Sequence, residues 1–179
     1  VADRTDPAPL LLGDGHQDPG GILDVQVGEP VFAVAGHDDT PLAQLQVEEQ
    51  KVRAALQDAH DTGRIAYEFL GATTLDELYR QLNRFHHRIA VFHYAGHADG
   101  YQLLLENAAG QNEIAHGQGL VSFFAKQDSL KLIFLNGCST QGQVQRLLEA
   151  GVPVVIATSA PVEDEKASRF GQRFYQGLE

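Results

Sequence analysis

The strongest constraint on the fold is the alternation of short apolar runs with longer amphipathic segments. The apolar runs are rich in β-branched and aromatic residues, as is typical of strands buried on both faces; they are Val31–Ala35, Ile89–Tyr94, Leu132–Leu135 and Val154–Ala157, with Arg64–Leu70 as a further strand candidate. Buried strands of this kind run parallel and are joined by helical crossovers. The sequence therefore predicts an α/β fold with a mainly parallel sheet and helices on both faces, a three-layer α/β/α arrangement.

Helix signals fill the segments between the strands. Thr40 and Pro41 have the residue types of an N-cap and a first helical position, and Gly63 is a stop signal. In this first helix one face is apolar, and we expect the opposite face to be exposed; that polar face carries Glu48, Glu49, Lys51 and Arg53.

Further helices are predicted along the rest of the chain. Thr74 and Glu77 have the spacing of a capping box before the apolar stripe of a second helix. Residues 119–127 and a segment around Leu147 are also predicted to be helical, and a last helix is expected to bury Ala167, Phe170 and Phe174. Tyr101–Leu105 is predicted to be one strand of a hairpin that turns near residues 107–110.

Composition bounds the domain organisation and the partners. Residues 1–29 are rich in Asp, Pro and Gly and are predicted to be an arm or a linker from an upstream module, and residues 30–179 a single domain. The net charge of −11 argues against nucleic acid as a partner. Two interpretations of this acidic charge stay open: it attracts basic partners or substrates, or it only keeps the domain soluble. With no apolar run near the ~20 residues of a membrane span and a single cysteine, we expect a cytoplasmic protein that does not bind membranes.

Two short segments carry the residues that are capable of chemistry. They are His93-Tyr94-Ala95-Gly96-His97, after the buried run Arg88–Phe92, and Asn136-Gly137-Cys138-Ser139-Thr140, after the buried run Lys131–Leu135. Both segments should therefore emerge at the carboxyl edge of the sheet. A cysteine and a histidine at one edge suggest a thiol nucleophile and its base, with side chains facing each other. We expect Ser139 or Thr140 to cap a helix whose N-terminus lowers the thiol pKa and whose N–H groups stabilise an oxyanion.

Other interpretations of these residues stay open. Cys138 has the residue type of a small buried hydrophobe, and His97 alone has that of an ordinary loop residue. His93 and His97 are four residues apart, but no matching set of ligands accompanies them, so no metal is expected. No dinucleotide or P-loop fingerprint is present, and no cofactor is expected.

With the residue before each included, the two segments, Phe92–His97 and Leu135–Thr140, resemble the signature segments of CHAT domains. These are the caspase-like cysteine peptidases of the clan of caspases and separases, which are often attached to tetratricopeptide repeats. The similarity extends to Leu148–Thr158, to Val162–Asp164 and to Phe170–Leu178, and covers about Val31 to Leu178. The resemblance implies that His97 is the catalytic histidine and Cys138 the nucleophile. It also implies an oxyanion hole built from the backbone N–H groups of Cys138 and Ala98, where the family usually has glycine in place of Ala98.

By the same resemblance the chain is a cysteine endopeptidase that cuts a specific protein or peptide substrate under the control of an attached sensor or repeat module. A binding or signalling module that recruits a partner protein is the alternative, and acyl transfer on the same sheet is a third. The loops expected to form the substrate pocket carry Asp164 and, second, Asp99, which favours cleavage after a basic residue. The competing interpretation is that Glu163 and Glu165 cap the last helix.

Overall fold

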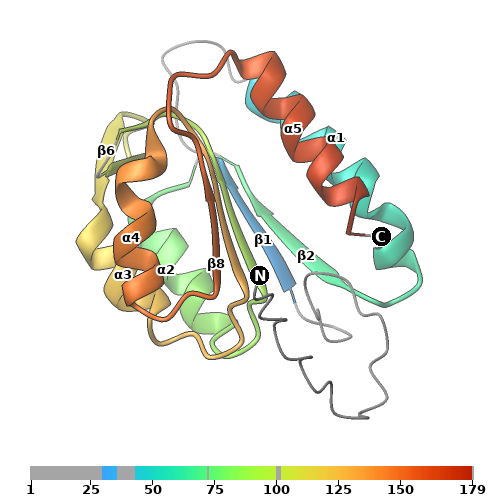
Figure 1. The fold of residues 1–179 in the computed structure, drawn as a ribbon, viewed down its shortest axis with the longest axis horizontal. Helices are drawn as coiled ribbons and strands as arrows, with labels where there is room; N and C mark the ends of the chain where they lie inside the picture. Colours follow the sequence, from blue (N-terminus) through green and yellow to red (C-terminus); the bar gives the residue numbers. More distant parts are fainter. Residues whose placement is uncertain (1–29, 36–42, 72, 100–101, 179) are drawn as a thin grey trace, which may run out of the picture.

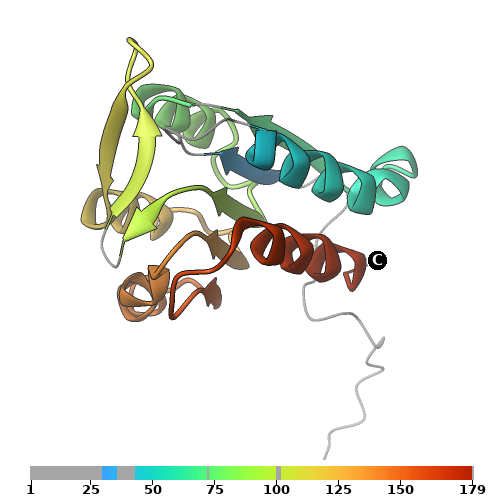
Figure 2. The same ribbon diagram turned by 90° about the horizontal axis from the view of Figure 1, so that it is seen from above.

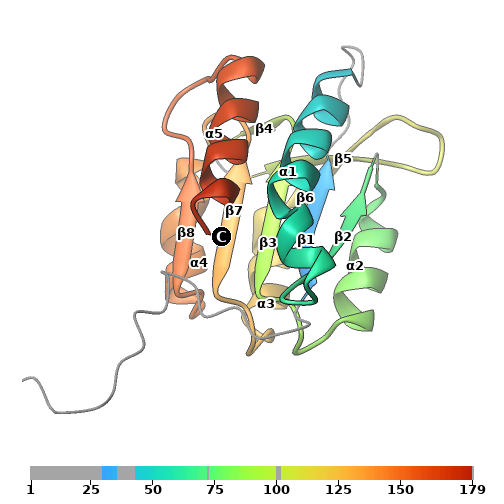
Figure 3. The same ribbon diagram turned by 90° about the vertical axis from the view of Figure 1, so that its right-hand side faces the viewer.

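Five parallel strands form the main sheet, in the order β2-β1-β3-β7-β8 (Figure 3). The computed structural model describes residues 30–35, 43–71, 73–99 and 102–178. The strands are β1 (Pro30–Ala35), β2 (Ala66–Leu70), β3 (Val91–Ala95), β7 (Leu132–Asn136) and β8 (Val154–Ala157). The predicted parallel sheet is confirmed.

Helices cover both faces of this sheet (Figure 1). One face carries α1 (Ala43–Asp61) and α5 (Asp164–Gln176). The other carries α2 (Leu75–Arg84), α3 (Gly117–Phe124) and α4 (Val144–Glu149). The three-layer α/β/α arrangement predicted from the sequence is therefore present.

A small antiparallel sheet stands beside the main one (Figure 2). It contains β4 (Ala98–Asp99), β5 (Gln102–Glu106) and β6 (Asn112–His116), in that order. Its tip is closed by Asn107, whose side-chain oxygen accepts hydrogen bonds from the N–H groups of Ala109 (2.9 Å) and Gln111 (3.0 Å). The predicted hairpin is confirmed, and β4 adds a strand directly after His97 that the sequence did not indicate.

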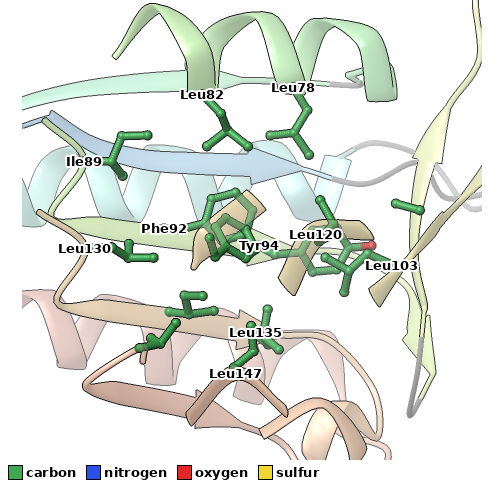
Figure 4. Packing of buried hydrophobic residues seen from close by; sticks show 14 of the residues in the cluster. Leu78, Leu82, Ile89, Phe92, Tyr94, Leu103, Leu120, Leu130, Leu135 and Leu147 are labelled. Carbon is green, nitrogen blue, oxygen red and sulfur yellow. The ribbon is translucent and has the colours of Figure 1, made fainter. Parts of the chain in front are cut away.

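The two central strands of the main sheet are buried at every position. β3 pairs with β7 from Val91↔Leu132 to Ala95↔Asn136. Their alternate residues feed two cores: Phe92 and Tyr94 join the cluster under α2, α3 and α4 (Figure 4), and Val91 joins the cluster under α1 and α5. A slip by one residue would send every side chain to the wrong core, so burial on both faces fixes the register.

Local signals in the sequence set several helix ends. The Thr74 side-chain oxygen accepts a hydrogen bond from the Glu77 N–H (3.1 Å), which confirms Thr74 as the N-cap of α2. Gly63, with a φ of +72°, follows the end of α1 as predicted. The predicted N-cap Thr40, the predicted first helical position Pro41 and the predicted arm over residues 1–29 lie outside the described residues.

Two predictions about helix faces are wrong. Glu48, expected on the exposed face of α1, is 6% exposed, and Phe170, expected to be buried by α5, is 52% exposed. The cause is the close packing of α5 against α1, in which α5 turns Ser168, Gly171 and Tyr175 inward. Small side chains on α5 leave room for the Glu48 carboxylate, and Phe170 is rotated toward solvent.

No helix within the described residues combines the length and apolar character needed to cross a bilayer.

Leu82 provides a test of the larger core. Its side chain is fully buried between α2 and the sheet (Figure 4). We expect Leu82→Ala to lower the free energy of unfolding by about 2–5 kcal/mol, because it removes buried apolar contacts and leaves a cavity. Urea denaturation measures this loss. The control is Leu148→Ala, a residue 47% exposed on α4, for which a change within about 0.5 kcal/mol is expected; equal losses for the two variants would contradict the assignment of the core.

Candidate active site

Neighbouring parallel strands bring the two segments predicted to be catalytic to the same edge of the sheet. The last paired residues of β3 and β7 are Ala95 and Asn136, and His97 and Cys138 each follow at the second position after that pair. Adjacent strands lie about 4.8 Å apart. The two loops therefore begin as direct neighbours, and the sequence prediction of a shared edge is correct.

The loops touch through their glycines. A Cβ atom added to Gly137 would lie 2.6 Å from the carbonyl oxygen of Gly96 and 3.0 Å from the Cβ of Ala98. Real Cβ atoms do not approach backbone that closely, so only glycine fits at position 137. Gly96 has a φ of +154°, a conformation that residues with a side chain rarely adopt. Both loops thus depend on glycine at the point where they meet.

The Tyr94 side chain anchors the backbone of the His97 loop. The Tyr94 hydroxyl lies between the carbonyl oxygens of His97 and Leu104, the latter at 2.9 Å. The Leu104 N–H also donates to the His97 carbonyl (3.0 Å), which joins the loop to β5. Burial raises the pKa of Tyr94, so its hydroxyl keeps the proton that it donates. These bonds fix the backbone of His97, whose side chain is exposed.

The backbone after Cys138 differs from the predicted helix start. Ser139 has a left-handed conformation (φ 55°, ψ 33°), uncommon for a residue other than glycine, and its side chain makes no capping hydrogen bond. A 3-10 turn, η1 (Thr140–Gln143), follows, and α4 begins only at Val144 and is six residues long. The prediction that Ser139 or Thr140 caps a helix beside Cys138 is therefore wrong. Cys138 itself is partly buried.

Thr140 instead joins the Cys138 loop to the strand beside it. Its hydroxyl donates to the Leu135 carbonyl (3.1 Å) and accepts from the Thr158 N–H (3.0 Å). The Thr158 hydroxyl in turn donates to the Gly137 carbonyl. Thr158 follows β8, so the end of that strand holds the loop in place. Sequence reasoning missed this contact because no local pattern links residues 18 positions apart.

The residues predicted to bind substrate are only partly described. The backbone of Asp99 lies in β4 beside the His97 loop, and Asp164 is the first residue of α5. The side chains of both lie outside the described part of the chain. Glu163, proposed as a cap, occupies the N-cap position, but its carboxylate binds Lys166 Nζ (2.8 Å) and no backbone N–H.

His93 is not part of this loop edge. Its ring stacks on Phe134 at 4.5 Å in the core between the sheet and α5. Over the residues that the structure describes, no group of three or more His, Cys, Asp or Glu side chains could hold a metal ion.

Comparison with solved structures identifies the class of fold. The crystal structure of the Drosophila initiator caspase Dronc is similar to this chain, with a TM-score of 0.54 and 14% identity over 98% of this chain and 77% of that one. A crystal structure of a putative pilus assembly-related protein from Burkholderia pseudomallei gives a TM-score of 0.36 and 16% identity over 86% of this chain and 94% of that one. The similarity to the caspase shows that the fold is caspase-like.

Sequence comparison then identifies the family. The chain matches the CHAT domain family over residues 5–179 and belongs to it. No curated protein matches the chain. The CHAT resemblance and the caspase-like fold expected from the sequence are both confirmed.

Gly137 gives a direct test of how tightly the two loops are packed. We expect Gly137→Ala to destabilise the protein by about 1–3 kcal/mol, as overpacking typically does, because its methyl group would collide with the Gly96 carbonyl. Chemical denaturation measures the change. Gly71→Ala is the matched control, since a Cβ there meets no described atom within 4 Å. A Gly137→Ala protein as stable as the control would contradict the close approach of the loops.

Proposed function

We propose that this chain is a cysteine endopeptidase of the caspase-like CHAT type, with Cys138 as nucleophile and His97 as its general base. The observation that carries the proposal is the pairing of β3 with β7, after which both residues follow at equivalent positions. Membership of the CHAT family supports the same assignment. Control by an attached sensor or repeat module stays a prediction.

The proposed reaction has two halves. In the first, His97 takes the thiol proton of Cys138 while the sulfur attacks the scissile carbonyl carbon, and the proton then passes to the leaving amine as the C–N bond breaks. In the second, water attacks the carbonyl carbon of the resulting thioester while His97 takes a proton from the water. The C–S bond then breaks, which releases the acid, and the proton on His97 returns to the sulfur to restore the thiol. The backbone N–H groups of Cys138 and Ala98 are the proposed donors to the oxyanion.

The loop contacts described above support such a site because catalysis depends on fixed geometry. A misplacement of ~1 Å can cost a rate on the order of a hundredfold. Tyr94 holds the His97 backbone, and Thr140 with Thr158 holds the Cys138 loop. Ala98 takes the place of the family's usual glycine, and its methyl group packs against the core cluster under α2, α3 and α4.

Covalent labelling tests the pair of catalytic residues. We expect a peptide acyloxymethyl ketone to modify Cys138, detected by mass spectrometry, and Cys138→Ser to abolish labelling. His97→Ala should lower the labelling rate at least about a hundredfold, the range of a lost general base. The control is His116→Ala, an exposed histidine at the end of β6. Wild-type protein that is never labelled, or labelling that is unaffected by His97→Ala, would favour the binding-module alternative.

We further propose that the substrate has a basic residue before the scissile bond, bound by Asp164 or, second, Asp99. A charge-assisted hydrogen bond contributes about 1.5–3 kcal/mol, so Asp164→Ala should lower kcat/KM for Lys or Arg substrates roughly tenfold or more. A peptide-library profile measures the preference. Glu163→Ala is the matched control, because the Glu163 carboxylate already binds Lys166. A preference for acidic or aromatic residues, or a profile unchanged by both aspartate variants, would exclude this pocket.

A further inference from the structure

A buried polar contact lies directly before the cysteine loop, on the sheet face covered by α1 and α5 (Figure 3). Asn136 is the last residue of β7, followed by Gly137 and Cys138. Its side-chain amide donates to Glu48 Oε1 of α1 at 2.6 Å and to the Ala167 carbonyl of α5 at 3.1 Å. The side chains of Asn136 and Glu48 are both buried. The end of the strand that leads to the cysteine is thus joined to both helices of this face.

Glu48 is an unusual residue for this position. A carboxylate costs free energy to bury unless it is hydrogen-bonded and paired. Its hydrogen-bond partner is the Asn136 amide, and the Nε2 atom of His93 lies 3.3 Å from Oε1 without making a hydrogen bond to it. The His93 ring lies in the same core, between Phe134 and Tyr175. Burial and, second, the charge of Glu48 raise the pKa of Tyr175. Within this core the Glu48 carboxylate therefore accepts the hydrogen bond of the Asn136 amide, and the rings of His93 and Tyr175 pack around it.

The surrounding helices are packed closely enough to fix Glu48. A Cβ atom on Gly171 of α5 would lie 3.3 Å from Glu48 Oε1 and 3.8 Å from Asn136 Nδ2. One turn further along α1, Lys51 Nζ donates to the Ser168 hydroxyl of α5 at 3.0 Å. The carboxylate consequently has little freedom to move away from Asn136.

We infer that Glu48 is a positioning residue for Cys138. Its hydrogen bond to Asn136 fixes one end of the cysteine loop, and the contacts of Thr140 with Thr158 fix the other. Between these two anchors the chain contains only Gly137, Cys138 and Ser139, so a shift of Asn136 is transmitted to the sulfur. The consequence for peptide hydrolysis rests on the proposed peptidase function, whereas the anchoring of the loop does not.

Two substitutions of Glu48 separate the hydrogen bond from the charge. Glu48→Gln keeps an acceptor oxygen for the Asn136 amide, and Glu48→Leu removes the acceptor while filling the same space. We expect hydrogen–deuterium exchange of the amides at Gly137–Ser139 to rise up to about tenfold in Glu48→Leu, the equivalent of one lost hydrogen bond. Exchange in Glu48→Gln should stay near the wild-type rate.

Peptide hydrolysis by the same 179-residue chain gives the second measurement. Glu48→Leu should lower kcat at least about tenfold with little change in KM, because a displaced nucleophile affects the chemical step more than substrate binding. Glu48→Gln should restore most of the rate. The matched control is Glu49→Leu, the neighbouring residue of α1, whose carboxylate pairs with Arg53 at 2.7 Å and which should leave exchange and kcat unchanged.

The outcomes are distinguishable from failure of the proposed function. Wild-type protein without peptidase activity would refute that function, and exchange alone would then decide the role of Glu48. A folded Glu48→Leu protein with wild-type exchange, or Glu48→Gln as impaired as Glu48→Leu, would overturn the inference. If Glu48→Leu does not fold, Gly171→Ala is the deciding variant. Its methyl group would lie 3.3 Å from Glu48 Oε1 and displace the carboxylate, while alanine favours the helix more than glycine does. Unchanged exchange at Gly137–Ser139 in that variant would also overturn the inference.

Discussion

The pairing of β3 with β7 is the constraint on which the site depends. Both strands are buried at every position, and each feeds side chains into two cores, so a slip by one residue would send every side chain to the wrong core. The last pair of that register, Ala95↔Asn136, sets where both loops leave the sheet. The relative position of His97 and Cys138 along the sheet edge is therefore a consequence of hydrophobic packing and needs no direct bond between them.

Hydrogen bonds from polar side chains fix the backbone of the two loops that follow β3 and β7, where the strand pairing has ended. On the face of α2, α3 and α4, the Tyr94 hydroxyl reaches through the apolar cluster to the His97 carbonyl. On the opposite face, Asn136 is held by Glu48. Each core face thus anchors one loop: Tyr94 anchors the His97 loop from one face, and Asn136 anchors the Cys138 loop from the other.

The sequence predicted what depends on local pattern and missed what depends on packing between distant elements. The buried strands, the Thr74 cap and the shared edge of His97 and Cys138 follow from residue types over a few positions. The burial of Glu48 could not be predicted, because on α1 it has the same surroundings in sequence as Glu49. Only the small residues of α5, more than 100 positions later, create the space that it occupies. The contact between Thr140 and Thr158 was missed for the same reason, since β8 supplies it from outside the motif.

The buried cluster also explains why the cysteine loop can be rigid without a long helix behind it. The α4 helix has six residues and begins after a 3-10 turn, so its peptide dipoles add little at Cys138. Hydrogen bonds to fixed partners on either side of the loop supply the order that a helix N-terminus was expected to give. A carboxylate in a core is rarely the most stable choice. Its place here is consistent with a contribution to the geometry of the loop, where an apolar side chain of the same size would pack equally well but could not hold Asn136.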